Sequence, residues 1–331
     1  RDGLVTGVQT CALPISIPFG MNRRGLNPLA LLREAMELAG ICRREHPDVV
    51  HLVALRPVVV GGLAARMAGI RRVVSAVTGM GFLFTDGGRL PWIRSAVQRV
   101  LPWLLSRGLT IVQNEDDARQ LAAFGLCSDR LRLIPGAGVD TKRFTPVVTS
   151  EDVPVVMMAS RLLRDKGITE FVEAARTLRG RDARFVLVGA IDADNPASIS
   201  DAELKRWMAE GVVEWWGQSE DMAATLARAN IVCLPSYREG LPKVLLEAMA
   251  CGKVCVATDV PGCREAVHHE DNGLLVPVKD AAALESAISR LLDHPDERRR
   301  MGARGRARAV EEFSQERVIE TTLAVYREVL A

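Results

Sequence analysis

Residues Pro235 to Gly252, PSYREGLPKVLLEAMACG, follow the apolar run Ile231 to Leu234 and decide how this part of the chain folds. The apolar run predicts a buried strand, which ends at Pro235 because proline has no backbone N–H to donate. Pro242 suits the first turn of a helix, and Gly252 is a typical stop signal. The stretch therefore predicts a strand, a loop and a helix, an arrangement that binds ligands in open α/β sheets.

Two glutamates frame this loop: Glu239 lies beside Gly240, and Glu247 lies inside the predicted helix. The free amides of a helix amino terminus suit phosphate or another oxygen-rich ligand. A carboxylate in the same pocket can accept hydrogen bonds from two neighbouring hydroxyl groups. These groups together indicate a nucleotide-sugar site, whereas two isolated glutamates are more often solvated surface residues.

The rest of the sequence alternates predicted strands and helices, which favours parallel sheets with helices on both faces. The 331 residues, 48% of them hydrophobic, are enough for two domains with separate cores. We expect a first domain at residues 17–148, a second at residues 149–312 and a closing helix at residues 313–331. The boundary follows a stretch punctuated by glycine and proline at residues 135–146.

Composition narrows the possible partners and compartments. A net charge of +2 gives no general support for a nucleic-acid partner. The seven cysteines form no C-x-x-C pair, which favours reduced thiols of a cytoplasmic protein over disulfides or a zinc site. No apolar run reaches the roughly 18 residues of a membrane span. Any membrane contact is therefore expected to be peripheral, at the inner face of the plasma membrane.

A set of short motifs carries a resemblance to a known family. EGLPKVLLE resembles the E-x7-E signature of the retaining, family-four nucleotide-sugar glycosyltransferases of GT-B fold. The accompanying motifs, in the family's order, are GVDTKRFTP at residues 138–146, Ser160-Arg161, Lys166-Gly167, Gly217, Pro261-Gly262 and Asn272-Gly273. The resemblance implies two Rossmann-like, doubly wound parallel-sheet domains that face each other across a cleft.

The resemblance also bears on the start of the chain. Family members begin with a strand, a glycine-rich turn and a helix that we do not find here, so we expect the first domain to be incomplete. Residues 1–16 look like non-native sequence, and we leave them out of the fold prediction.

The resemblance assigns roles to single residues. Arg161 and Lys166 are expected to hold the diphosphate of a donor and to act in catalysis, the first as a bidentate ligand and the second as a point charge. Without the family motif, an ordinary charged loop at residues 164–166 would be an equally good interpretation. Glu239, the third expected catalytic residue, is placed near the donor sugar, and Glu247 is placed at the two ribose hydroxyls. The other expected donor contacts are Gly217 and Gln218 at the nucleobase and Gly240, Leu241 and Pro242 at the sugar and diphosphate, although Pro242 itself has no amide hydrogen.

A first-domain loop narrows the resemblance further. TGMGFLF at residues 78–84 resembles enzymes that add N-acetylgalactosamine or a similar sugar to undecaprenyl-diphosphate-linked bacillosamine. Many family members place a histidine in this loop, and here we expect substrate contacts from Thr78, Gly79, Met80 and Gly81 instead. The implied reaction moves GalNAc, GlcNAc or a similar sugar from a UDP-sugar to a lipid-linked saccharide.

Three further features each allow two interpretations. Asp192-Ala193-Asp194 reads as D-x-D, a manganese motif in another glycosyltransferase class, but it lies in a polar loop and GT-B enzymes generally need no such metal. We therefore expect no metal and no cofactor.

His51, at a strand end, could face the cleft, but a lone histidine there is more often structural. A row of arginines on a late helix indicates a solvated face or a contact with anionic lipid: Arg300, Arg304 and Arg308.

The predicted helix at residues 91–105 has an apolar stripe flanked by Arg89, Arg94 and Arg99. The stripe suits an interfacial membrane helix and equally a helix that packs on the sheet. It consists of Trp92, Ile93, Val97, Val100, Leu101, Leu104 and Leu105.

Two rival functions stay open. A sugar-nucleotide epimerase shares the GT-B fold, and a truncated protein could bind nucleotide without transferring a sugar. A nicotinamide dehydrogenase is disfavoured because no G-x-G-x-x-G follows a predicted strand.

Overall fold

The computed structural model describes residues 16–20, 27–78, 91–136, 138–147 and 153–331, without the side chains of residues 91–97. Its helices are α1 (Pro28–Glu45), α2 (Leu55–Met67), α3 (Pro91–Leu105), α4 (Glu115–Ala123), α5 (Ile168–Thr177), α6 (Asp201–Ala209), α7 (Met222–Ala227), α8 (Lys243–Ala250), α9 (Pro261–Ala266), α10 (Ala281–Asp293), α11 (Pro295–Glu311) and α12 (Gln315–Leu330). Its strands are β1 (Val50–Val53), β2 (Val73–Val77), β3 (Leu109–Val112), β4 (Leu131–Leu133), β5 (Val155–Ala159), β6 (Arg184–Val188), β7 (Glu214–Trp215), β8 (Ile231–Leu234), β9 (Val254–Thr258) and β10 (Gly273–Val276).

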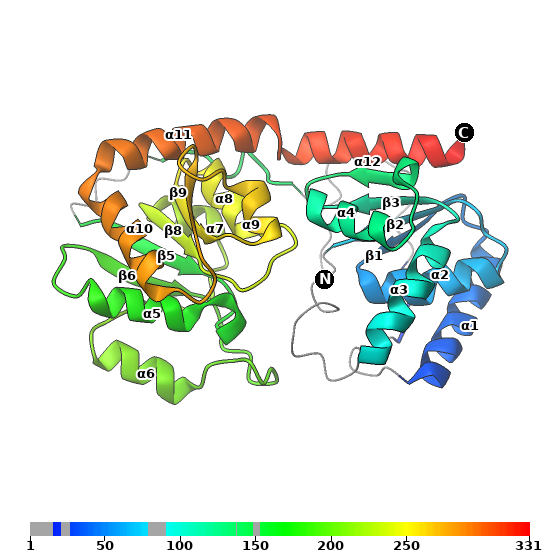
Figure 1. The fold of residues 1–331 in the computed structure, drawn as a ribbon, viewed down its shortest axis with the longest axis horizontal. Helices are drawn as coiled ribbons and strands as arrows, with labels where there is room; N and C mark the ends of the chain where they lie inside the picture. Colours follow the sequence, from blue (N-terminus) through cyan, green and yellow to red (C-terminus); the bar gives the residue numbers. More distant parts are fainter. Residues whose placement is uncertain (1–15, 21–26, 79–90, 137, 148–152) are drawn as a thin grey trace.

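The strands form two separate sheets. The first has four strands in the order β1-β2-β3-β4, and the second has six in the order β10-β9-β8-β5-β6-β7. Every strand pair is parallel. Figure 1 shows the two units side by side, with α11 along the second and α12 along the first. The predicted class, two doubly wound parallel-sheet units, is confirmed.

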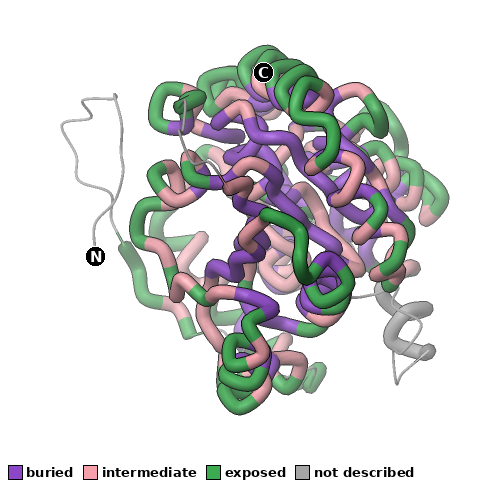
Figure 2. Tube along the Cα trace, turned by 90° about the vertical axis from the view of Figure 1, so that its left-hand side faces the viewer, coloured by how far each residue is buried: buried purple, intermediate pink, exposed green. Residues whose placement is uncertain are grey.

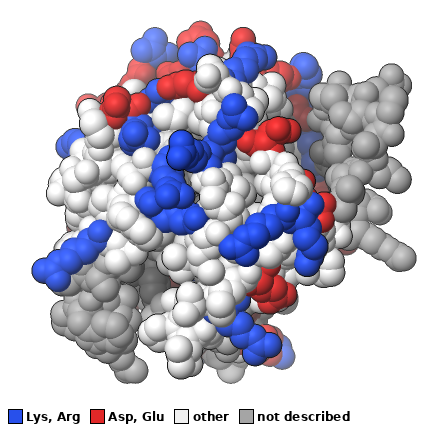
Figure 3. Space-filling model, turned by 90° about the vertical axis from the view of Figure 1, so that its right-hand side faces the viewer, with Lys and Arg blue, Asp and Glu red and all other residues white. Residues whose placement is uncertain are grey.

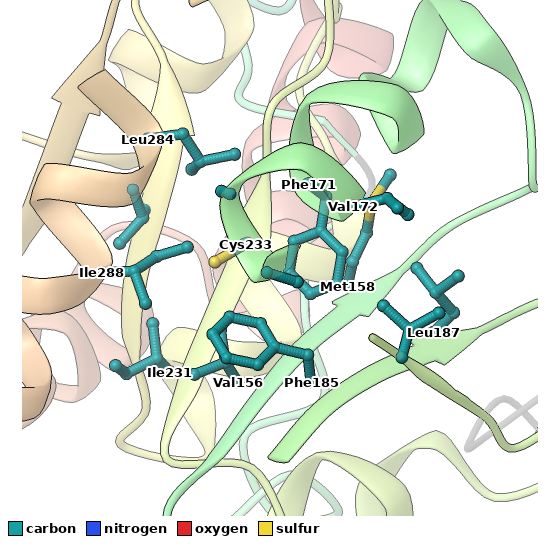
Figure 4. Close-up of a cluster of buried hydrophobic side chains, with 14 of the residues drawn as sticks. Val156, Met158, Phe171, Val172, Phe185, Leu187, Ile231, Cys233, Leu284 and Ile288 are labelled. Carbon is teal, nitrogen blue, oxygen red and sulfur yellow. The ribbon is translucent and has the colours of Figure 1, made fainter. Parts of the chain in front are cut away.

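The core of the second unit lies between its sheet and the helices that cover it. Phe171 of α5 and Ile288 of α10 belong to one buried cluster with Met158 and Phe185, and the close-up in Figure 4 shows these side chains between the helices and the sheet. The rings of Phe171 and Phe185 meet edge to face with their centroids 6.0 Å apart. Figure 2 shows the buried trace at the centre of the unit and exposed segments around it. This packing makes the strand ends a rigid support for the loops that follow them.

The helix predicted after Pro235 is α8. It begins at Lys243, with Pro242 as its N-cap residue, and no side chain caps its first turn. Gly252 follows its end with φ +69° and donates its N–H to the carbonyl of Met249 at 2.8 Å. Glycine is the residue that adopts this left-handed conformation without strain, so the predicted stop signal is correct.

The last helix returns to the first sheet. Val318 and Val325 of α12 pack in one cluster with Val74 of β2. The phenol of Tyr326 lies 2.6 Å from Nδ1 of His51, and the two rings meet edge to face. The structural role predicted for His51 is therefore confirmed, and the C-terminal segment ties the two units together.

The structure contains a helix, α6, that was not predicted from the sequence. Ser200 and Glu203 form a reciprocal capping box at its start, and Leu204 and Trp207 are buried. The S-x-x-E pattern followed by apolar residues was the available signal in the sequence.

The helix with two open interpretations, α3, packs partly on the core. Leu101, Leu104 and Leu105 are buried, whereas Val100 and Trp103 are 45% and 51% exposed. The core interpretation therefore holds for the end of the helix. The side chains of Trp92, Ile93, Arg94 and Val97 and all of Arg89 lie outside the described residues. Within the described part of the chain, no helix has both the length and the apolar character that crossing a membrane requires.

The row of arginines on α11 is paired with carboxylates. Arg300 lies 3.8 Å from Glu297 on the same helix, and Arg304 lies 2.7 Å from Asp271. Arg308 is 3.0 Å from Glu312 and donates to a backbone carbonyl, with its side chain only 10% exposed. Arg300 and Arg304 are 56% and 63% exposed, which fits a solvated face, and only Arg308 is held in the structure.

Candidate functional site

A pocket of about 510 Å³ lies at the carboxyl ends of the strands in the second sheet. Arg161 follows β5, Asp192 follows β6, Gln218 follows β7, and Val244 and Glu247 belong to α8. The fold thus brings Arg161, Gln218 and Glu247 to one pocket, although the first and the last are 86 positions apart in the sequence. Their roles in binding a donor stay predictions.

The rim of this pocket depends on a close approach between two strand ends. Gly189 has φ +144°, and a Cβ there would lie 1.9 Å from the carbonyl oxygen of Ser160. Its N–H donates to the carbonyl of Gly217 at 2.8 Å. Gly217 therefore shapes the rim through its backbone, and its neighbour Gln218 lines the pocket.

Lys166 and Glu239 form an ion pair beside the pocket. The Nζ of Lys166 lies 2.7 Å from Oε1 of Glu239, and the side chains are only 19% and 13% exposed. Their loops touch directly, since a Cβ on Gly167 would lie 2.0 Å from the carbonyl oxygen of Pro235. Neither residue is on the wall of the 510 Å³ pocket. Lys166 shares the segment after β5 with Arg161, and Glu239 lies on the loop before α8, the helix of Glu247.

The loop between β8 and α8, residues 235–242, is held by contacts that the sequence analysis did not identify. The N–H of Tyr237 donates to the carbonyl of Asp165 at 2.9 Å, and its phenol donates to Oε1 of Glu170 at 2.6 Å. Burial, with the neighbouring Glu170, raises the pKa of Tyr237. Tyr237 thus stays a neutral hydrogen-bond donor that fixes the loop to the segment carrying Lys166.

Glu247 is a buried carboxylate at the base of the pocket, with a relative exposure of 7%. Burial raises its pKa, while Lys243 and Arg143 act in the opposite direction. The Nζ of Lys243 lies 3.4 Å from Oε1 of Glu247, one turn away on α8. The geometry offers two carboxylate oxygens to a ligand that enters the pocket.

Arg161 is paired with the first aspartate of the D-x-D sequence. Its guanidinium lies 3.7 Å from Asp192 Oδ2, and the arginine side chain is 63% exposed. The described residues contain no group of three or more His, Cys, Asp or Glu side chains placed to hold a metal ion. Asp192 thus serves as a counter-ion for a residue expected to bind phosphate.

The remaining predicted contacts differ in kind. Leu241 packs against a second buried cluster, which includes Leu245 of α8. A Cβ on Gly136 of the linker would lie 2.9 Å from the side chain of Leu241. Pro242 is buried and precedes the uncapped first turn of α8. Gly240 faces the first unit, because a Cβ there would lie 2.5 Å from the carbonyl oxygen of Thr78. Gly79, Met80 and Gly81 lie outside the described residues.

Comparison with known proteins identifies the class. Residues 140–308 match the family model described as glycosyl transferases group 1, and residues 7–143 match the model described as glycosyltransferase family 4. The chain belongs to the group 1 glycosyltransferases, and it is a transferase of GT-B fold. The family recognised from the sequence motifs is confirmed.

Individual relatives agree with this class. The N,N'-diacetylbacillosaminyl-diphospho-undecaprenol alpha-1,3-N-acetylgalactosaminyltransferase of Campylobacter jejuni is 30% identical over 95% of this chain and 86% of that protein. The UDP-Gal:alpha-D-GlcNAc-diphosphoundecaprenol alpha-1,3-galactosyltransferase of Escherichia coli is 26% identical over 82% of this chain and 73% of that protein. The solved structure of sucrose-phosphate synthase from Thermosynechococcus elongatus superimposes with a TM-score of 0.79 at 25% identity, covering 91% and 78% of the two chains.

Proposed function

We propose that this glycosyltransferase moves GalNAc, GlcNAc or a similar sugar from a UDP-sugar to a lipid-linked saccharide, with retention at the anomeric carbon, in surface polysaccharide or glycan assembly. The Campylobacter and Escherichia relatives are named for acceptors carried on undecaprenyl diphosphate, which supports the acceptor class. The observation that carries the proposal is the Lys166–Glu239 ion pair beside the pocket lined by Arg161 and Glu247.

The ion pair suggests how the donor binds. A diphosphate gives Lys166 a new anionic partner, and Glu239 is then free to accept a hydrogen bond from a hydroxyl of the donor sugar. Arg161 is released from Asp192 in the same way. Both cations then stabilise the negative charge that grows on the phosphate as the bond to the sugar breaks.

The chemical step needs no further group from the protein. The acceptor oxygen bonds to the anomeric carbon on the face from which the phosphate leaves, and the acceptor proton passes to a phosphate oxygen. Because the two cations neutralise the leaving group, we expect the reaction to require neither a metal ion nor a cofactor.

The test is transfer measured with a panel of UDP-sugars and lipid-linked acceptors. Lys166→Ala should lower turnover by about 10²–10³-fold, the usual loss for a group that stabilises developing charge. Glu239→Ala should also lower turnover, because the hydrogen bond to the donor sugar is lost. Arg164→Ala is the matched control, because Arg164 pairs with Glu203 on α6 at 2.7 Å. Circular dichroism checks the fold of each variant. Unchanged turnover in either active-site variant would end the proposal.

The same panel separates the rival functions. An epimerase releases an isomeric UDP-sugar when no acceptor is present. A protein that only binds nucleotide gives a calorimetric signal with UDP but no product with any acceptor.

We also propose that the protein is cytoplasmic and reaches its acceptor by peripheral contact with the inner face of the plasma membrane. Lys and Arg side chains spread across the face at the first unit's end of the molecule (Figure 3). Trp103 of α3 is half exposed, with the guanidinium of Arg66 3.9 Å from its ring centroid. An aromatic ring beside a cation suits a lipid interface. Trp103→Ala should weaken sedimentation with anionic vesicles, and unchanged sedimentation would contradict this location.

A further inference from the structure

The loop that carries Glu239 is held from the opposite unit by a buried asparagine. Asn114 follows β3 and is the N-cap residue of α4, with a relative exposure of 1%. Its Nδ2 donates to the carbonyl oxygen of Gly240 at 3.1 Å. Figure 1 shows α4 and α9 on the facing sides of the two units. The residue next to Glu239 is therefore bonded to the first unit.

The orientation of this amide is fixed by its other contacts. Oδ1 accepts the backbone N–H of Asp117 at 2.8 Å, which is the ordinary N-cap bond. The NH₂ group is then on the other side of the amide, where it donates to the carbonyl of Gly240 and to the carboxylate of Asp117. One side chain thus caps α4 and holds the loop of the other unit.

Gly240 fits closely between the two units. A Cβ on Gly240 would lie 2.5 Å from the carbonyl oxygen of Thr78 and 3.1 Å from Oε1 of Gln113. From the other side, a Cβ on Gly262 would lie 2.1 Å from the carbonyl oxygen of Gly240. The loop therefore has close backbone neighbours in both units, and the asparagine bond ties it to the first unit.

The walls of the 510 Å³ pocket, where we expect the nucleotide, are formed by the second unit. All residues on its walls lie between Ala159 and Glu247, within the second unit. A contact that reaches Gly240 from the first unit therefore affects the place expected for the sugar and leaves the place expected for the nucleotide unchanged.

We propose that Asn114 is a positioning residue that holds Glu239 in its working place when the two units are closed on each other. This inference rests on the proposed function. Binding of UDP by the second unit does not need the bond, whereas the transfer step does.

The test uses Asn114→Ser in the full chain. Serine keeps an oxygen that can cap α4 but is too short to donate to Gly240, so the fold should be retained. We expect kcat to fall about tenfold, the effect of losing one buried hydrogen bond, with the Kd of UDP unchanged. Hydrogen exchange at the amides of residues 236–241 should become faster.

The matched control is Asp116→Asn, which removes the 3.2 Å ion pair between Asp116 and Arg264. That ion pair also joins the two units, but neither residue belongs to the loop at residues 235–242. Both kcat and hydrogen exchange in the loop should therefore stay as in the unsubstituted protein. Unchanged kcat in Asn114→Ser, or a parallel loss of UDP affinity and melting temperature, would overturn the inference. If the unsubstituted protein transfers no sugar, the proposed function fails. In that case, hydrogen exchange at residues 236–241 that is unchanged in Asn114→Ser would also overturn the positioning role.

Discussion

Replacing Glu247 by glutamine tests the expected ribose contact. A hydrogen bond to a charged group contributes about 1.5–3 kcal/mol. Glutamine keeps one oxygen acceptor of similar shape but loses the charge and the second oxygen. The variant should therefore bind UDP about 10- to 150-fold more weakly, which is that range of free energy expressed as a ratio of Kd values.

The assay is isothermal titration calorimetry with UDP and with 2′,3′-dideoxy-UDP, on the unsubstituted protein and on Glu247→Gln. If the carboxylate binds the diol, removing the hydroxyl groups should weaken binding to the unsubstituted protein far more than binding to the variant. The same ratio of UDP to dideoxy-UDP affinity in both proteins would refute the assignment.

The burial of Glu247 adds a pH dependence. Because burial raises its pKa, the carboxylate is protonated at a higher pH than an exposed glutamate would be. UDP affinity should fall as the pH is lowered through that raised pKa, and this step should be missing in Glu247→Gln. Compared with the unfolded chain, the folded protein without ligand binds a proton at Glu247 more readily. This group's contribution to folding stability is therefore greatest at low pH and is lost as the pH rises through the raised pKa.

Three predictions concern the scaffold. Gly262→Ala puts a Cβ 2.1 Å from a carbonyl oxygen of the β8–α8 loop, so kcat should fall about tenfold or more with native circular dichroism; full activity would contradict this. Ser200→Ala should lower the free energy of unfolding, measured with urea, by about 1 kcal/mol. The backbone hydrogen bond from Ser200, together with further contacts, lowers the pKa of Glu203 from 4.5 to about 2. The contribution of Glu203 to folding stability should therefore be lost as the pH falls from 4.5 to about 2. Tyr326→Phe should cost about 0.5–1.5 kcal/mol. Burial lowers the pKa of His51, so the contribution of this residue to folding stability should disappear as the pH falls below 6.5. A melting temperature that does not change with pH below 6.5 would contradict this prediction.

The sequence by itself determined the class of fold and the positions of the strand, loop and helix that carry the candidate site. Alternating apolar runs and helical repeats predict strands and helices, because each element must bury one face. Proline and glycine gave the start and end of α8 to within a residue, since both restrict the backbone locally. The capping box of α6 was equally local and was available in the sequence.

Only the tertiary structure decided which distant groups meet. Tyr237 reaches Glu170, and Asn114 reaches Gly240, through contacts that join residues 67 and 126 positions apart. Local preferences of the backbone hold no information on such pairs, because their distance depends on how whole sheets and helices pack. The same reason explains why α12, at the end of the chain, covers the first sheet.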